Sequence, residues 1–171
     1  MTQRGSKIEK ILFATAFREL SSATAPFACM MSLKHDAELH VLHVVPLPPP
    51  IRGGGDLFSA PDPGDPLLLE RMEDAVKASL ERLKDFTQTT IAPVGCRVIP
   101  AAVIGIIWDE IVNYAREKQI DLIIMGTRRH GVLRRLLMGS VTKAVIEHAP
   151  CPVMLVPVDD HRSDSTKDKA A

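Results

Sequence analysis

The sequence predicts an α/β fold, a doubly wound five-stranded parallel sheet with helices on both faces. Five short apolar runs alternate with helical stretches along the 171 residues, and such alternation is typical of parallel sheets with helical crossovers. The length fits one domain with tails. Hydrophobic residues make up 46% of the chain and charged residues 25%, as in ordinary soluble globular proteins.

The first half of the chain contains two predicted strands, a helix between them and a long loop. The unbroken apolar run 11–16 is typical of a strand that is buried on both faces. The alanine-rich stretch 18–34 is predicted to be helical despite Pro26 near its start. A second strand spans 39–45. The proline- and glycine-rich segment 46–65 is a predicted loop, and it is either a lid over a neighbouring pocket or a loop without that role.

The middle of the chain begins with its strongest helix signal. Apolar residues recur there at spacings of three and four, which predicts an amphipathic helix containing Leu68, Leu69, Met72, Ala75, Val76, Leu80, Leu83 and Phe86. The segment 96–101 is a weaker strand signal. A helix is predicted after Gly105, and Trp108 lies on its apolar stripe, so we expect this side chain to belong to the core.

The last part of the chain supplies the remaining strand–helix–strand unit. Residues 121–125 form an apolar run that ends at Gly126, and Ser140 is a suitable N-cap for a helix over 141–148. A final strand is predicted over 152–156, closed by Pro157.

Composition excludes several classes of protein. Lys plus Arg equals Asp plus Glu at 21 each, so the charge balance predicts no nucleic-acid or membrane partner. Apolar runs are too short for a membrane span, and the polar N-terminus lacks a signal-peptide pattern. The protein is therefore expected to be soluble and cytoplasmic. Three widely spaced cysteines, Cys29, Cys96 and Cys151, are expected to be reduced thiols buried as small hydrophobic residues.

The segment from Gly126 to Ser140 is the strongest indication of a ligand site. A glycine directly after a strand permits a turn with positive φ, and a helix that begins at Gly139-Ser140 points free N–H groups at the loop. Arginines and His130 concentrate positive charge there, at Arg128, Arg129, Arg134 and Arg135. Two interpretations remain open: a cradle for a phosphate, or a solvated basic loop with Ser140 acting only as a cap.

The same segment closely resembles a known family. Gly126-Thr127, Gly131 and Gly139-Ser140-Val141, followed by the run Ala149–Val156, resemble the universal stress protein family. The resemblance spans about 7–158, which leaves a short extension at 1–6 and a charged tail at 159–171 that we expect to be disordered. It implies the adenine nucleotide alpha hydrolase-like fold with strand order 3-2-1-4-5, and a regulatory or protective role in stress. In one branch it implies ATP or AMP bound between strands 1 and 4.

Two residues depart from that nucleotide-binding branch. The branch has an aspartate after the first strand, which holds the nucleoside end, whereas this chain has Ala16. It also has a second glycine where this chain has Arg129. Either Arg129 binds phosphate in place of the backbone, or it obstructs the pocket. The alternative to nucleotide binding is therefore a vestigial pocket in a protein that acts through another protein.

The resemblance and the loop together give a set of candidate nucleotide-binding residues. Val44 and Val45 are expected to line the base, and the full set is Ala16, Val44, Val45, Gly126, Thr127, Arg128, Arg129, Gly131, Gly139, Ser140, Val141 and Thr142. The sequence carries no phosphate-loop signature and no nucleophile elbow, so no catalytic residue is predicted. No metal site is predicted either, because His40 and His43 are three apart in a strand and should point to opposite faces.

The last predicted strand suggests how the chain associates. Val153, Met154, Leu155 and Val156 are apolar on both faces, yet a final strand in this winding lies at the edge of the sheet. An unpaired apolar edge favours pairing with a second copy, and the family resemblance implies the same contact. A homodimer through this strand is therefore expected.

Overall fold

The computed structural model describes residues 7–17, 19–47, 65–91, 95–129 and 139–159. It confirms a five-stranded sheet with the order β3-β2-β1-β4-β5, in which every neighbouring pair is parallel. The strands are β1 (Lys10–Ala14), β2 (Glu38–Pro46), β3 (Val98–Gly105), β4 (Leu122–Arg129) and β5 (Val153–Asp159). The helices are α1 (Glu19–His35), α2 (Pro66–Phe86), α3 (Ile107–Glu117) and α4 (Ser140–His148), with a π-helical turn η1 (Thr87–Ile91) directly after α2.

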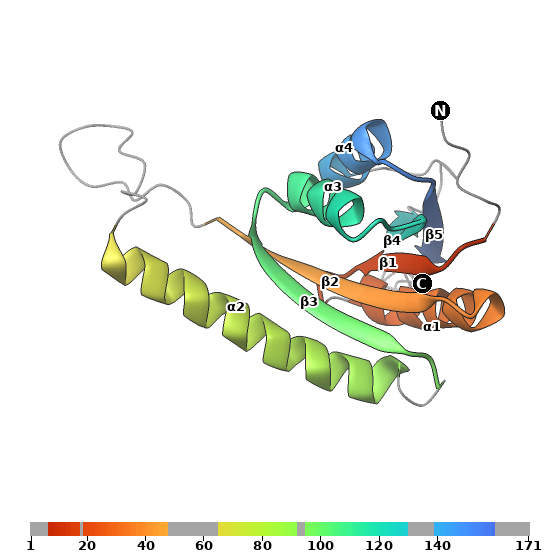
Figure 1. The fold of residues 1–171 in the computed structure, drawn as a ribbon, viewed down its shortest axis with the longest axis horizontal. Coiled ribbons are helices and arrows are strands. Elements are labelled where there is room, and N and C mark those ends of the chain that lie inside the picture. Colours follow the sequence, from red (N-terminus) through yellow and green to blue (C-terminus); the bar gives the residue numbers. More distant parts are fainter. Residues whose placement is uncertain (1–6, 18, 48–64, 92–94, 130–138, 160–171) are drawn as a thin grey trace, which may run out of the picture.

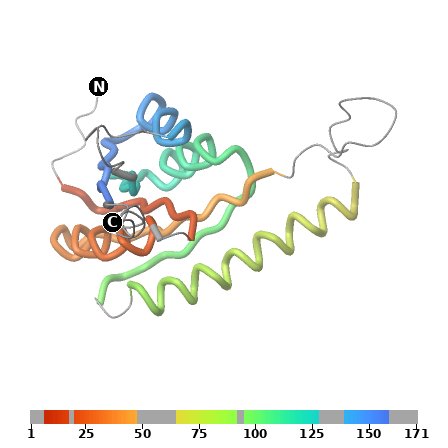
Figure 2. Tube along the Cα trace, turned by 180° about the vertical axis from the view of Figure 1, so that it is seen from behind, coloured from red at the N-terminus to blue at the C-terminus, as the bar shows by residue number. Residues whose placement is uncertain are grey.

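The sheet lies between two layers of helices. Helices α1 and α2 cover one face and α3 and α4 cover the other (Figure 1), and the view from behind shows the same sandwich (Figure 2). Successive side chains of β1 pack against the two helical layers alternately, because side chains along a strand point to opposite faces of the sheet. Phe13 packs in the cluster beneath α1, whereas Leu12 packs in the cluster beneath α3 and α4. Trp108 packs against the second cluster, as its place on the apolar stripe predicted.

The strand boundaries differ from the predicted ones, and β1 ends at Ala14, two residues earlier than expected. The largest differences lie at the carboxyl ends of β3, β4 and β5. β3 runs to Gly105 rather than stopping at Ala101, because it pairs with β2 as far as Pro46. β4 does not end at Gly126 but continues to Arg129 beside β5. β5 includes Pro157, which an edge strand tolerates because the missing N–H leaves no inner ladder bond unmade.

The long helix α2 begins with a clear cap. Pro66 opens the helix, and the N–H of Leu67 donates to Asp65 Oδ1 at 3.0 Å. Burial is concentrated at the other end, where Leu83 is inaccessible to solvent and Ile91 of η1 is equally buried. The predicted loop 46–65 starts inside β2 and ends at this cap. Its residues 48–64 lie outside the described part of the chain, as do the tail from 160 onward and the extension 1–6.

Two cysteines form a disulfide that the sequence did not predict. Cys29 of α1 is bonded to Cys96, which directly precedes β3, and their Cα atoms lie 5.8 Å apart. The expectation of three reduced thiols is therefore wrong for this pair and holds for Cys151 alone. Since disulfides are rare in the reducing cytosol, the cysteines no longer support a cytoplasmic location.

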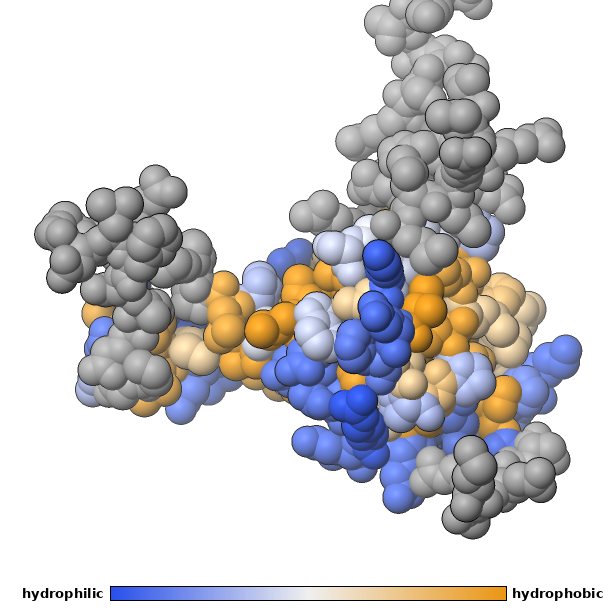
Figure 3. All heavy atoms as spheres, turned by 90° about the horizontal axis from the view of Figure 1, so that it is seen from above, coloured by the Kyte–Doolittle hydropathy of each residue, from blue (hydrophilic) through white to orange (hydrophobic). Residues whose placement is uncertain are grey.

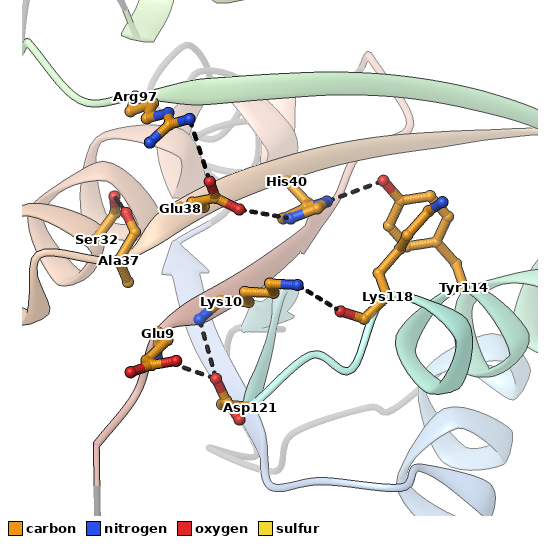
Figure 4. Close-up of polar contacts among 10 residues, drawn as sticks. All are labelled: Glu9, Lys10, Ser32, Ala37, Glu38, His40, Arg97, Tyr114, Lys118 and Asp121. Atoms are coloured by element: carbon orange, nitrogen blue, oxygen red, sulfur yellow. Dashed lines mark hydrogen bonds and ion pairs between the residues drawn. The ribbon is translucent and has the colours of Figure 1, made fainter.

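A network of polar contacts lies at the amino ends of the strands (Figure 4). Pro46 is at the other end of β2. His40 Nδ1 and the hydroxyl of Tyr114 share a hydrogen bond of 2.9 Å, and Glu38 lies 3.3 Å from the guanidinium of Arg97. Asp121 accepts hydrogen bonds from the backbone of residues 9 and 10. Burial lowers the pKa of His40 despite the carboxylate of Glu38 nearby, so this imidazole favours the neutral form.

Exposed apolar side chains are spread over the surface. The large ones include Met30 and Leu33 on α1, Leu67 on α2 and Ile146 on α4, and hydrophobic residues stand beside hydrophilic ones on the face shown in Figure 3. Within the described ranges, no helix combines the length and the apolar character that crossing a membrane would require.

Candidate functional site

A cavity lies at the carboxyl ends of β1, β2 and β4. Its volume is about 400 Å³, within the roughly 300–1,000 Å³ typical of small-molecule sites. It straddles the point where the winding of the sheet reverses between β1 and β4, which is where ligands bind in open α/β folds. Apolar side chains form most of the wall, and the described lining residues are Ala14, Thr15, Ala16, Leu20, Ser21, Leu42, His43, Val44, Pro46, Ile107, Ile111, Met125, Gly126, Val141 and Thr142.

The turn after β1 forms one side of the cavity and is held by its own side chains. The N–H of Ala16 donates to Ser21 Oγ at 3.0 Å, and the N–H of Phe17 donates to Thr15 Oγ1 at 3.2 Å. Phe17 has a φ of +54°, a left-handed conformation that is costly for a residue with a Cβ. The turn therefore needs support from its surroundings.

The ring of Phe17 provides that support. Its centroid lies 4.3 Å from that of the His43 imidazole, and the guanidinium of Arg82 lies 4.6 Å above it. Phe86 meets the ring edge-on at 6.2 Å. His43 donates from Nδ1 to the carbonyl of Thr15 at 2.9 Å. Burial lowers the pKa of His43, the Thr15 contact opposes this shift, and Arg82 adds to it.

The amino end of α4 forms another part of the wall. Gly139, with an extended backbone, is the N-cap and makes no side-chain cap bond. The prediction that Ser140 caps this helix is therefore wrong, since Ser140 is the first helical residue. The first intrahelical bond runs from the N–H of Lys143 to the carbonyl of Gly139 at 3.0 Å, so the N–H groups of residues 140–142 precede it. Val141 and Thr142 line the cavity.

Gly126 does not form the predicted turn, and a glycine is required there by packing against α1. β4 continues through it, paired with Val156, and it is not among the described residues with positive φ. A Cβ at this position would lie 2.5 Å from Thr24 Oγ1 and 2.8 Å from Leu20 Cγ. Close approach of α1 to β4, rather than a special backbone angle, thus requires a glycine here.

The structure brings part of the predicted residue set to the cavity. Ala16, Val44, Gly126, Val141 and Thr142 line it. Four further predicted residues are close in sequence to these wall residues but do not line the cavity: Val45, Thr127, Gly139 and Ser140. Arg128 and Arg129 are residues of β4, and their side chains, like Gly131, His130, Arg134 and Arg135, lie outside what the structure describes.

Other wall residues were missed, for two reasons. Ile111 and Met125 look like ordinary core positions in a periodic pattern, and nothing in that pattern marks one end of a strand as open. Ser21 and His43 carried a usable signal, because polar residues beside the carboxyl ends of parallel strands face the site in such folds.

The fold and this cavity define a class of small α/β proteins that have a ligand-sized cavity where the winding of the sheet reverses. Residues 7–157 match the universal stress protein family, so the chain belongs to that family. It is 31% identical over 152 residues to a universal stress protein of Methanocaldococcus jannaschii, covering 86% of this chain and 81% of the relative.

Solved structures show the same architecture. The universal stress protein UspA from Lactobacillus plantarum superimposes with a TM-score of 0.61 at 27% identity, covering 89% of this chain and 99% of that one. A universal stress protein from Archaeoglobus fulgidus, solved in complex with dAMP, shares the fold with a TM-score of 0.57 at 21% identity, covering 86% and 96%.

Proposed function

We propose that this protein is a stress-response module that binds an adenine nucleotide, AMP or ATP, in the cavity between β1 and β4. The observation that carries the proposal is the cavity itself. Its wall combines apolar side chains such as Val44 and Met125 with the amino end of α4. An apolar wall suits a flat base, and a helix amino end suits a phosphate. The dAMP complex of the Archaeoglobus fulgidus relative supports the same ligand class.

The arrangement of β4 bears on how the phosphates would be held. Arg129 pairs with Asp159 of β5, so its backbone belongs to the sheet ladder and not to a turn. Phosphate contacts through backbone N–H groups are therefore assigned to the start of α4, at Val141 and Thr142. The base end lacks the carboxylate that the nucleotide-binding branch has, because Ala16 stands there.

Restoring that carboxylate tests the proposal through a gain of affinity, which a misfolded variant would not give. Calorimetry with AMP should show binding to the native chain. Ala16→Asp should tighten it by about tenfold, the value of one good hydrogen bond to a charged group. Ala16 is exposed, and Ala23, an exposed residue of α1 that does not line the cavity, provides the matched control. Ala23→Asp should leave the affinity unchanged. Absence of heat with both the native chain and Ala16→Asp would refute the proposal.

The module is proposed to be non-catalytic. None of the described wall residues is Asp, Glu, Lys, Arg or Cys, and His43 already uses Nδ1 on the Thr15 carbonyl. Nucleophilic chemistry needs a nucleophile hydrogen-bonded to a base. In the described part of the chain, the hydrogen-bond partners of Ser21 Oγ and His43 Nδ1 are both backbone groups. A second candidate function, a vestigial pocket in a protein that acts on a protein partner, is favoured specifically by Ala16.

The chain is further proposed to be a homodimer through β5. Among the described strands, β5 pairs with β4 alone and presents its other edge outward. Strand edges of this kind pair readily with a second copy. Light scattering at micromolar concentration should give twice the monomer mass, and a monomer there would contradict the assignment.

A further inference from the structure

The turn after β1 is tied to helix α2 through one aromatic ring. The ring of Phe17 contacts the His43 imidazole, the guanidinium of Arg82 and, nearly perpendicular to it, the ring of Phe86. Arg82 and Phe86 belong to α2, and neither lines the cavity. Phe17 is itself absent from the wall, although Thr15, Ala16 and Ser21 around it all line the cavity. The ring thus joins a helix outside the site to the backbone inside it.

The backbone at Phe17 is what gives the turn its shape. Its φ is +54°, and the hydrogen bond from the Ala16 N–H to Ser21 Oγ spans this residue, so that bond depends on the angle. A residue with a Cβ keeps this conformation only when neighbouring groups hold it. The contacts of the ring are such a restraint. They hold the Phe17 side chain in place, and with it the backbone to which the side chain is attached.

We infer that Phe17 is a positioning residue for the nucleotide site and that it couples ligand binding to α2. This inference rests on the proposed function and adds a residue that does not touch the ligand. Phe17 fixes the turn directly after β1, and that turn carries Thr15 and Ala16 of the cavity wall. Helix α2 holds Phe17 in place through Arg82 and Phe86. Because coupling between two sites is reciprocal, a ligand in the cavity should in turn stabilise α2.

A pair of substitutions separates the backbone role of Phe17 from simple packing. Phe17→Ala removes the ring and keeps a Cβ, so the turn should open. Phe17→Gly removes the ring as well but tolerates positive φ. We expect AMP to bind Phe17→Ala about tenfold more weakly than the native chain, and Phe17→Gly to stay within about threefold of it. A residue that acts only by packing would give the reverse order, because glycine fills less space than alanine.

Amide hydrogen exchange reads out the same distinction without a ligand. The Ala16 N–H, bonded to Ser21 Oγ, should exchange faster in Phe17→Ala and should keep its protection in Phe17→Gly. Equal loss of protection in the two variants would overturn the inference. If the native chain binds no AMP, the proposed function fails, whereas this exchange comparison still decides whether Phe17 sets the turn.

The coupling to α2 has its own measurement. AMP should slow exchange of the amides around Arg82 and Phe86 in the native chain and should not do so in Phe17→Ala. Arg82→Met should weaken AMP binding by about twofold to threefold, whereas Arg71→Met, at an exposed arginine of the same helix, should not change it. Equal effects of the two arginine substitutions would contradict the route through Phe17.

Discussion

Breaking the disulfide between Cys29 and Cys96 should lower the free energy of unfolding by about 4 kcal/mol, because the bond spans 67 residues of chain. The bond restricts the unfolded chain, and the restriction grows with the length of the loop that it closes. It also anchors the start of β3 to a fully buried position of α1. Urea unfolding with and without a dithiol reductant measures the difference directly.

The third cysteine supplies the control for that experiment. Burial raises the pKa of the Cys151 thiol to about 11, with Asp121 adding to the shift, so this thiol favours its protonated form near neutral pH. Cys151→Ser should leave the effect of the reductant unchanged, whereas Cys29→Ala with Cys96→Ala should abolish it. A count of three thiols in the denatured, unreduced protein would show that the bond does not form.

The order of elements could be predicted from the sequence because it depends on local patterns. The unbroken apolar run of β1 and the repeat of α2 each identify their own segment without reference to any other. Strand ends behave differently, because a partner strand sets them. β3 reaches Gly105 since Pro46 of β2 lies beside it, and β4 reaches Arg129 since Asp159 lies beside it. Neither partner is visible in the local pattern.

For the site, too, features set by local pattern could be predicted, whereas contacts between distant segments could not. The amino end of α4 and the position of Ala16 could be located from sequence, because both follow from where strands and helices meet. The disulfide could not, since it depends on α1 and the start of β3 approaching to a Cα separation of 5.8 Å. The ring contacts of Phe17 were equally hidden, because His43, Arg82 and Phe86 come from two different elements.

Gly126 shows how the packing of α1 controls the cavity, and its replacement should have a large effect. Gly126→Ala is expected to lower the free energy of unfolding by about 2 kcal/mol, because the core would be overpacked. The new Cβ would lie 2.5 Å from Thr24 Oγ1 and 2.8 Å from Leu20 Cγ. Thr24 has little room to move, since it is fully buried and donates from Oγ1 to the carbonyl of Leu20 at 2.7 Å.

The strain at Gly126 should also reach the ligand, because Leu20 is a wall residue of the cavity. Displacing it changes the shape of the wall, so we expect Gly126→Ala to weaken AMP binding by about tenfold. Gly139→Ala is the matched control for stability. Gly139 has a φ of −62°, and a Cβ there would meet nothing within 4 Å, so the substitution should cost no more than about 1 kcal/mol, the value of a poorer N-cap. Equal stability losses in the two variants, measured by urea unfolding, would mean that α1 does not pack on β4 as closely as the structure has it.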